Sequence, residues 1–324
     1  GVDLTGKRVA VIGTGSSAIQ SIPLIAEQAD KLIVYQRTPA YSMPAFNGPL
    51  DPADVSRMKQ NYRSYRAAQR AHFAGIPNPP RGMTPTLADG DNERRAKFED
   101  AWKTGILTAL TTSYSDVLTN KAANDVVSDF VRDKIRSRVK DPRTAEALAP
   151  KSFPIGTKRV CIDTNYYETY NQDHVRLVDL SKTPIETITP TGIRTSAGEE
   201  ALDAIVFATG FDAMTGALMN IDIRGVGGLA LRDKWANGPH TYLGLGVAGF
   251  PNFFTITGPS SPSVLSNMMV SIEQHVDWIS DCIGWMRKRG VAAIAPTEAA
   301  ESEWAAHNEQ VANLTLFPQA NSWY

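Results

Sequence analysis

The order of apolar and polar residues predicts a strand, a tight turn, a helix and a second strand within residues 7–38. An apolar run of strand length at 9–12 breaks at the glycine-containing residues 13–15. A helix-compatible segment follows, and a second apolar run at 32–35 completes the unit. Pro23 falls inside the predicted helix, where a proline costs about 3 kcal/mol unless a kink or cap relieves it. The pattern therefore predicts the first β-α-β unit of a dinucleotide-binding fold.

The middle of the chain has helical character. Residues 39–50 form a proline-containing loop, and residues 51–140 are charged, with apolar positions at helical spacing. A Pro/Gly-rich break at 75–85 interrupts this region, and Asp141-Pro142 and Pro150 mark its end. We expect a helical insertion, with one candidate apolar stripe at Val55, Met58, Tyr62 and Tyr65.

Strand character returns after the insertion. Runs at 175–180 and 185–195 predict antiparallel strands, the second turning at Pro190-Thr191-Gly192. The apolar run at 202–210 has the pattern of a buried strand that closes the sheet of the first unit.

The C-terminal third is less regular. Residues 211–250 are rich in glycine and predict short strands, and residues 253–259 predict another buried strand ending in a Gly-Pro turn. Residues 266–289 form an amphipathic helical pattern.

Composition narrows the class of protein. Lys+Arg 33 against Asp+Glu 34 gives a net charge of −1, which implies no attraction to nucleic acid or anionic membranes. The two cysteines, Cys161 and Cys282, are too few for a disulfide scaffold, and the five histidines show no metal-ligand spacing. Without a membrane-length apolar run or secretory signal, we expect a cytoplasmic protein. The ends at Gly1 and Trp323-Tyr324 suggest an internal segment of a longer chain.

The turn after the first strand carries the clearest chemistry. Gly13 permits the tight turn, Gly15 lets a pyrophosphate approach the backbone, and Ala18 lets the helix pack closely on the strand. We expect ligand contacts from the side chains along this turn and at the start of the helix: Thr14, Ser16, Ser17 and Gln20. For the last three, helix capping is the other role, and both roles can hold at once.

The end of the second strand selects the dinucleotide. A carboxylate there would bind a free ribose 2′-hydroxyl, whereas the guanidinium of Arg37 suits a 2′-phosphate. Thr38 is a suitable hydroxyl partner. The sequence therefore predicts NADP(H) rather than NAD(H).

Several blocks together resemble the Baeyer–Villiger monooxygenases. Besides the turn within residues 6–20, they are Tyr-Gln-Arg-Thr-Pro at 35–39, Gly-Thr-Lys-Arg at 156–159, Asn-Tyr-Tyr-Glu-Thr-Tyr-Asn at 165–171, Ala-Thr-Gly-Phe-Asp at 208–212, Thr-Tyr-Leu-Gly at 241–244, Gly-Pro-Ser-Ser-Pro-Ser-Val-Leu-Ser-Asn-Met at 258–268 and Asn-Ser-Trp-Tyr at 321–324. The resemblance implies an α/β fold: a Rossmann-like NADPH-binding domain (1–50 and 149–210) with a helical insertion (51–148), then the C-terminal portion of an FAD-binding domain (211–324). The family's N-terminal FAD fingerprint, its His/Trp-Pro signature and its C-terminal tail are not in this sequence.

The resemblance also implies cofactors and roles. NADPH reduces FAD, and O2 then gives a C4a-peroxyflavin that converts a small ketone to an ester or lactone. Lys158 joins Arg37 at the 2′-phosphate, while Arg159 stabilises the peroxide anion. Met268 approaches the flavin, Trp323 contacts nicotinamide or substrate, and a pocket-lining bulge comprises Ser263, Val264 and Leu265. The family's N-terminal FAD-binding segment would complete the site.

Two alternatives remain open on the sequence. A related flavin monooxygenase that oxygenates nitrogen or sulfur would use the same dinucleotide site, although Lys158 and Arg159 favour ketone oxidation. The chain could also act as an NADP(H)-binding module without turnover.

Overall fold

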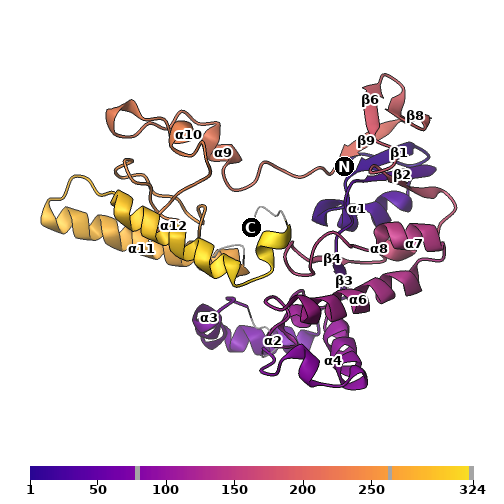
Figure 1. The fold of residues 1–324 in the computed structure, drawn as a ribbon, viewed down its shortest axis with the longest axis horizontal. Coiled ribbons are helices and arrows are strands. Elements are labelled where there is room, and N and C mark those ends of the chain that lie inside the picture. The colour runs from indigo at the N-terminus through magenta and orange to yellow at the C-terminus, as the bar shows by residue number, and fades with distance from the viewer. Residues whose placement is uncertain (77–80, 262–264, 321–324) are drawn as a thin grey trace. The chain divides into compact units, whose positions relative to one another are not determined.

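A parallel four-stranded sheet organises the N-terminal part of the chain in the computed structural model, which describes residues 1–76, 81–261 and 265–320 (Figure 1). In spatial order its strands are β5 (Val175–Asp179), β2 (Lys31–Gln36), β1 (Arg8–Ile12) and β9 (Ala204–Phe207). All three pairings are parallel. The predicted β-α-β unit is confirmed, since α1 (Ser16–Ala26) connects β1 to β2.

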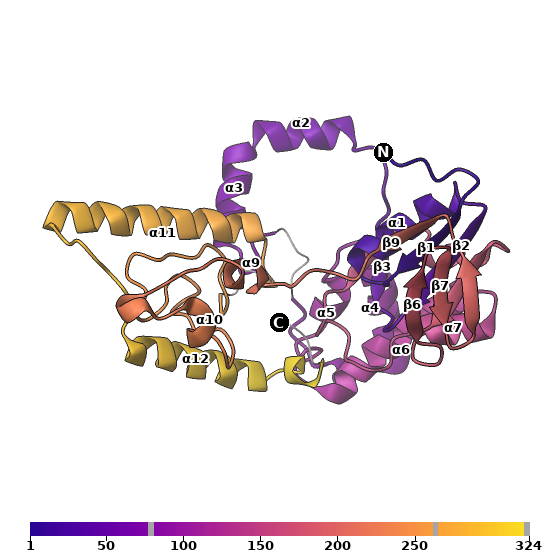
Figure 2. The same cartoon turned by 90° about the horizontal axis from the view of Figure 1, so that it is seen from above.

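The two faces of the sheet are covered by different elements. Side chains alternate along a strand, so Val9 and Val11 of β1 belong to the core that includes α1, whereas Ala10 and Ile12 belong to a second cluster. The second cluster includes Ile193 of an antiparallel three-stranded sheet. Figure 2 shows its strands beside the parallel sheet: β6 (Ile185–Thr189), β7 (Gly192–Thr195) and β8 (Gly198–Ala201).

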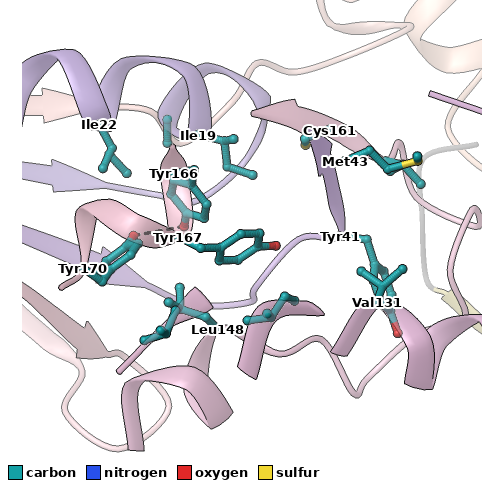
Figure 3. Close-up of a cluster of buried hydrophobic side chains, with 14 of the residues drawn as sticks. Ile19, Ile22, Tyr41, Met43, Val131, Leu148, Cys161, Tyr166, Tyr167 and Tyr170 are labelled. Carbon is teal, nitrogen blue, oxygen red and sulfur yellow. Dashed lines mark hydrogen bonds between the residues drawn. The ribbon is translucent and has the colours of Figure 1, made fainter. Parts of the chain in front are cut away.

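Aromatic side chains fill the core on the α1 side. Tyr166 and Tyr167 of α8 (Tyr166–Thr169) are buried beside Ile19 and Ile22 of α1 (Figure 3). The hydroxyl of Tyr170 donates to that of Tyr166 over 3.0 Å. A short parallel pair, β3 (Ser42–Pro44) with β4 (Cys161–Asp163), adds Met43 and Cys161 to the same cluster.

The helical insertion contributes to both compact units of the structure. Within the described residues, the first unit takes 1–48, 81–210 and 319–320, and the second takes 49–76, 211–261 and 265–318. In the first unit the insertion forms η1 (Thr86–Ala88), α4 (Asp91–Lys103), α5 (Ala109–Thr112), α6 (Lys121–Arg138) and α7 (Pro142–Leu148). In the second it forms α2 (Pro52–Gln60) and α3 (Tyr62–Ala71), which bury no residue, including the candidate stripe.

The second unit is mainly helical. Arg66 of α3 and Glu273 of the longest helix are joined by an ion pair of 2.5 Å. Glu301 is buried, accepts a hydrogen bond from the amide of Ala248 over 2.9 Å and pairs with Lys234 at 2.9 Å. Its helices are α9 (Gly216–Met219), η2 (Val226–Gly228), α10 (Leu231–Lys234), α11 (Met268–Arg289), α12 (Glu298–Asn313) and the start of η4 (Phe317–Ala320). None of the helices described here is both long and apolar enough to cross a membrane.

Four strand predictions need correction, while the helix predicted at 266–289 is confirmed as α11. Residues 175–180 do form a strand, but β5 runs parallel to β2. β9 closes the sheet as predicted, yet it is half-buried rather than buried, and its Phe207 is 62% exposed. The short strands predicted in 211–250 and the buried strand predicted at 253–259 are both wrong. Among the described residues of 211–261, isolated bridges take the place of strands, and one joins Gly246 to Phe254. An apolar run without a neighbouring ladder partner does not form a strand.

Candidate functional site

The turn between β1 and α1 requires glycine at its first position. Gly13 has a φ of +116°, and its amide donates to the carbonyl of Tyr35 over 2.9 Å. A Cβ atom at Gly13 would lie 2.3 Å from the carbonyl oxygen of Ala208. The turn is therefore closed on one side by the residue that follows β9.

The second glycine leaves the other side open. Gly15 is the N-cap of α1, no side chain caps the helix, and a Cβ atom at Gly15 would meet nothing within 4 Å. The first amides of α1 consequently lack side-chain partners, which is the arrangement that suits an anion.

The predicted capping role of the polar side chains on α1 is wrong. Ser16 Oγ lies 3.2 Å from Cys161 Sγ, while Gln20 Nε2 donates to the carbonyl of Ser16 over 3.0 Å. Ser17 is exposed, and the turn is instead fixed by Thr14, whose buried hydroxyl donates to the carbonyl of Thr38 over 3.0 Å. That bond joins the glycine turn to the end of β2.

A pocket of about 830 Å³ lies at the end of β2. Arg37 and Thr38, both predicted from sequence, line it. The other lining residues come from the ends of β2 and β5 and from the region of α7: Gln36, Pro39, Pro142, Arg143, Glu146, Ala147, Ala149, Lys151, Ser152, Asp179, Ser181 and Lys182. Cations and hydroxyl groups thus converge where a 2′-phosphate is expected.

The carboxylates that line this pocket accept hydrogen bonds from neighbouring side chains. Side-chain hydrogen bonds from Arg136 and Lys151 lower the pKa of Glu146 to about 2. Hydrogen bonding from Ser181 lowers the pKa of Asp179, and Lys182 adds to the effect. Both groups are ionised at neutral pH, and their charges are compensated by neighbours.

The second predicted basic pair lies outside the residues that line this pocket. Lys158 is partly buried, and its Nζ lies 4.8 Å from the centroid of the Phe153 ring. Arg159 is exposed, and no carboxylate of the described residues lies within 4 Å of its guanidinium. The two side chains differ in exposure, but their proposed roles at phosphate and flavin stay predictions.

Predicted residues near the C-terminus belong to the second unit or fall outside the described residues. Leu265 is 60% exposed, and Met268, which begins α11, is 43% exposed. Ser263, Val264 and Trp323 lie outside the part of the chain that the structure describes. Their roles stay predictions.

Sequence reasoning missed the basic residues that the insertion brings to the pocket. Arg143 belongs to α7, and Lys151 follows the helix. Their sequence signal was present, because cations flank the boundary residues Pro142 and Pro150. Nothing in the local pattern, however, placed them beside Arg37.

Known proteins match the chain from end to end. A Pseudomonas putida 2-oxo-Δ3-4,5,5-trimethylcyclopentenylacetyl-CoA monooxygenase is 43% identical over 326 residues, and a Baeyer–Villiger monooxygenase of Pseudooceanicola batsensis is 41% identical over 327 residues. Each alignment covers 100% of this chain and 59% of the relative. Over its whole length the chain is similar to Baeyer–Villiger monooxygenases. No family model matched it.

Solved structures agree with this family in fold. A steroid monooxygenase bound to NADP superposes with a TM-score of 0.94 at 51% identity, covering 100% of this chain and 62% of that one. The enzyme named OTEMO, in complex with FAD and NADP, gives a TM-score of 0.97 at 42% identity and covers 100% and 61%. A phenazine N-monooxygenase of Lysobacter antibioticus is also 38% identical, over 99% of this chain and 59% of its own length.

Proposed function

We propose that this chain is the NADPH-binding part of an FAD- and NADPH-dependent Baeyer–Villiger monooxygenase. The whole enzyme would insert one oxygen atom of O2 beside the carbonyl of a small ketone, giving an ester or lactone, water and NADP⁺. The observation that carries this proposal is the Arg37 pocket beside an open glycine turn. A cytoplasmic location and completion of the flavin site by an N-terminal segment are further parts of the proposal.

The residues present fit NADPH. Gly15 leaves room for a pyrophosphate against the uncapped start of α1. Arg37 and Thr38 offer a charged fork and a hydroxyl to the 2′-phosphate. We assign Lys158 as a further phosphate contact on the family resemblance.

The bound cofactors supply the electrons and the activated oxygen, and this chain supplies position and charge. Arg159 would hold a fixed positive charge beside the oxygen on which negative charge develops. A guanidinium can stabilise such charge without giving up its proton readily. Its exposed side chain has no carboxylate partner among the described residues, so its charge is available.

Arg159→Ala in the full-length enzyme tests this assignment. We expect ester formation to fall about 10²- to 10³-fold, the effect of removing one preorganised oxyanion partner, while NADPH binding is retained. Product by gas chromatography and NADPH affinity by fluorescence titration are the measurements. Arg95→Ala, which removes another exposed arginine of the same unit, should retain wild-type turnover. Normal ester yield in Arg159→Ala would refute the role.

Oxygenation at nitrogen or sulfur is the second candidate. The relative named as a phenazine N-monooxygenase supports considering it, since it matches the chain almost as well as the ketone-oxidising relatives do. Parallel assays of a cyclic ketone, a thioether and a phenazine separate the two chemistries. Preferred turnover of the ketone supports our proposal, and exclusive heteroatom oxygenation contradicts it.

The chain by itself could be a nucleotide-binding module. A titration of the 324-residue chain with NADPH, followed by oxygen consumption with added FAD, tests this. Binding without oxygen consumption assigns turnover to the longer protein.

A further inference from the structure

We propose that Arg143 of α7 binds the 2′-phosphate together with Arg37, so that the helical insertion helps to select NADPH over NADH. The inference rests on the proposed NADPH site and adds a specificity-determining residue to it. A phosphate dianion is the ligand chemistry that two converging guanidinium groups recognise.

The fold brings Arg143 to the end of β2. Arg37 directly follows β2, and both arginines line the same pocket of about 830 Å³. Gln36, the buried last residue of β2, donates from Nε2 to the carbonyl of Ala147 over 2.7 Å. This bond ties α7 to the strand that presents Arg37. The helix bearing Arg143 is therefore fixed relative to the predicted phosphate contact.

The other two cations of the pocket are already compensated. Lys151 Nζ lies 2.6 Å from Glu146 Oε2, and Lys182 Nζ lies 3.4 Å from Asp179 Oδ2. By contrast, no carboxylate of the described residues lies within 4 Å of either arginine in the pocket. The two arginines are therefore the pocket cations that form no ion pair within the described residues.

The acidic groups closest in sequence to Arg143 have other partners. Glu146 Oε1 accepts a hydrogen bond from Arg136 Nε over 2.5 Å, while its Oε2 accepts one from Lys151 Nζ over 2.6 Å. Asp141 caps α7, accepting from the amide of Thr144 over 2.8 Å and from its hydroxyl over 2.7 Å. Besides these hydrogen bonds from Thr144, the charge of Arg143 contributes to the lowered pKa of Asp141. No carboxylate of the described residues forms an ion pair with the exposed guanidinium of Arg143, which is therefore available to a ligand.

Hydroxyl groups complete a phosphate-binding environment. Thr38, Ser152 and Ser181 line the pocket beside the arginines. Ser181 Oγ donates to Asp179 over 2.6 Å, whereas the hydroxyl of Ser152 has no side-chain partner within the described residues. A 2′-phosphate could thus receive neutral donors as well as two cations.

The test uses the full-length enzyme and two adenosine fragments, 2′,5′-ADP and 5′-AMP. Arg143→Ala should weaken 2′,5′-ADP binding by about tenfold or more, the effect of one charge-assisted hydrogen-bonded contact, and change 5′-AMP binding by less than about threefold. Isothermal titration gives both affinities, and the KM ratio for NADPH and NADH should change in the same direction. Arg143→Lys, which keeps the charge but not the fork, should fall between the wild type and Arg143→Ala.

Two reference variants make the outcomes distinct. Arg37→Ala should lose 2′,5′-ADP selectivity, and Arg95→Ala should retain it. If Arg37→Ala loses selectivity while Arg143→Ala and Arg143→Lys keep it, the role of Arg143 is overturned and the NADPH site stands. If the wild type binds 2′,5′-ADP no better than 5′-AMP, the NADPH assignment itself fails.

Discussion

Two glycines of the β1–α1 turn are needed for different reasons. Gly13 has a positive φ and no room for a Cβ atom, so its constraint comes from the fold. Gly15 has a φ of −84° and open space around its missing Cβ atom, so the fold itself would accept alanine. The sequence motif names both residues, but only the structure separates the folding requirement from the binding requirement.

Alanine at each glycine tests this separation in the full-length enzyme. Gly13→Ala should lower the free energy of unfolding by about 1–3 kcal/mol, because the backbone would be strained. Gly15→Ala should keep the wild-type melting temperature and weaken NADPH binding, because the methyl group would occupy the approach to the pyrophosphate. Differential scanning fluorimetry and NADPH titration measure the two effects. Wild-type affinity in Gly15→Ala would contradict the proposed pyrophosphate position.

At the scale of elements, an ion pair links the start of β1 to the residue before the edge strand β9. We call this pair, Arg8 with Asp203, the clamp. Asp203, which precedes β9, accepts from the amide of Arg8 over 2.8 Å and from its guanidinium over 2.7 Å. Hydrogen bonding from the Arg8 side chain is the largest cause that lowers the pKa of Asp203. Because the folded-state pKa is depressed, the stabilisation is present above the unfolded value of about 3.9 and is lost as the pH falls further.

Asp203→Asn should therefore show a pH-dependent loss of stability. We expect a decrease in melting temperature on the order of a few degrees at pH 7, since both side chains are partly exposed. The difference from wild type should shrink below about pH 4, because there Asp203 takes up a proton in the unfolded chain while the folded state still disfavours its protonation. Asp173→Asn, at an exposed position in the same unit, is the control. A difference that persists unchanged at pH 2.5 would contradict the clamp.

Predictions of helices and strands were confirmed where the pattern of neighbouring residues alone defines the element. The alternation along β1 and β2 and the glycine turn between them predicted the β-α-β unit, and α1 continues through Pro23. The direction of β5 was wrong, because apolar alternation does not encode strand direction. That direction follows from the crossover connections of the parallel sheet.

At the scale of the whole molecule, the insertion contributes to the lining of the Arg37 pocket and to both compact units. Helices α2 and α3 belong with residues 211–318, whereas α7 lies at the pocket of the first unit. The predicted domain boundaries at 50, 148 and 210 stay predictions. The chain spans about three fifths of the length of its curated relatives. Catalytic activity therefore has to be measured on the longer protein.

Cofactor-dependent melting tests the proposed site in that longer protein. NADP⁺ at about 100 times its dissociation constant should add about 2.7 kcal/mol to the free energy of unfolding of the unit that binds it. NAD⁺ at the same concentration should shift the melting temperature much less, since it lacks the 2′-phosphate. Equal shifts from the two nucleotides would contradict selection by the Arg37 pocket.

The sequence by itself determined the glycine turn, the strand before it and the arginine after β2, because these depend on residues within one β-α-β unit. It also carried the family resemblance, which the relatives confirm. Only the tertiary structure decided which distant segments form the pocket. Gln36, α7 and the end of β5 meet there through hydrogen bonds and strand pairing between residues more than 100 positions apart. Periodicity records which face of an element is buried, but it does not record which other element covers that face.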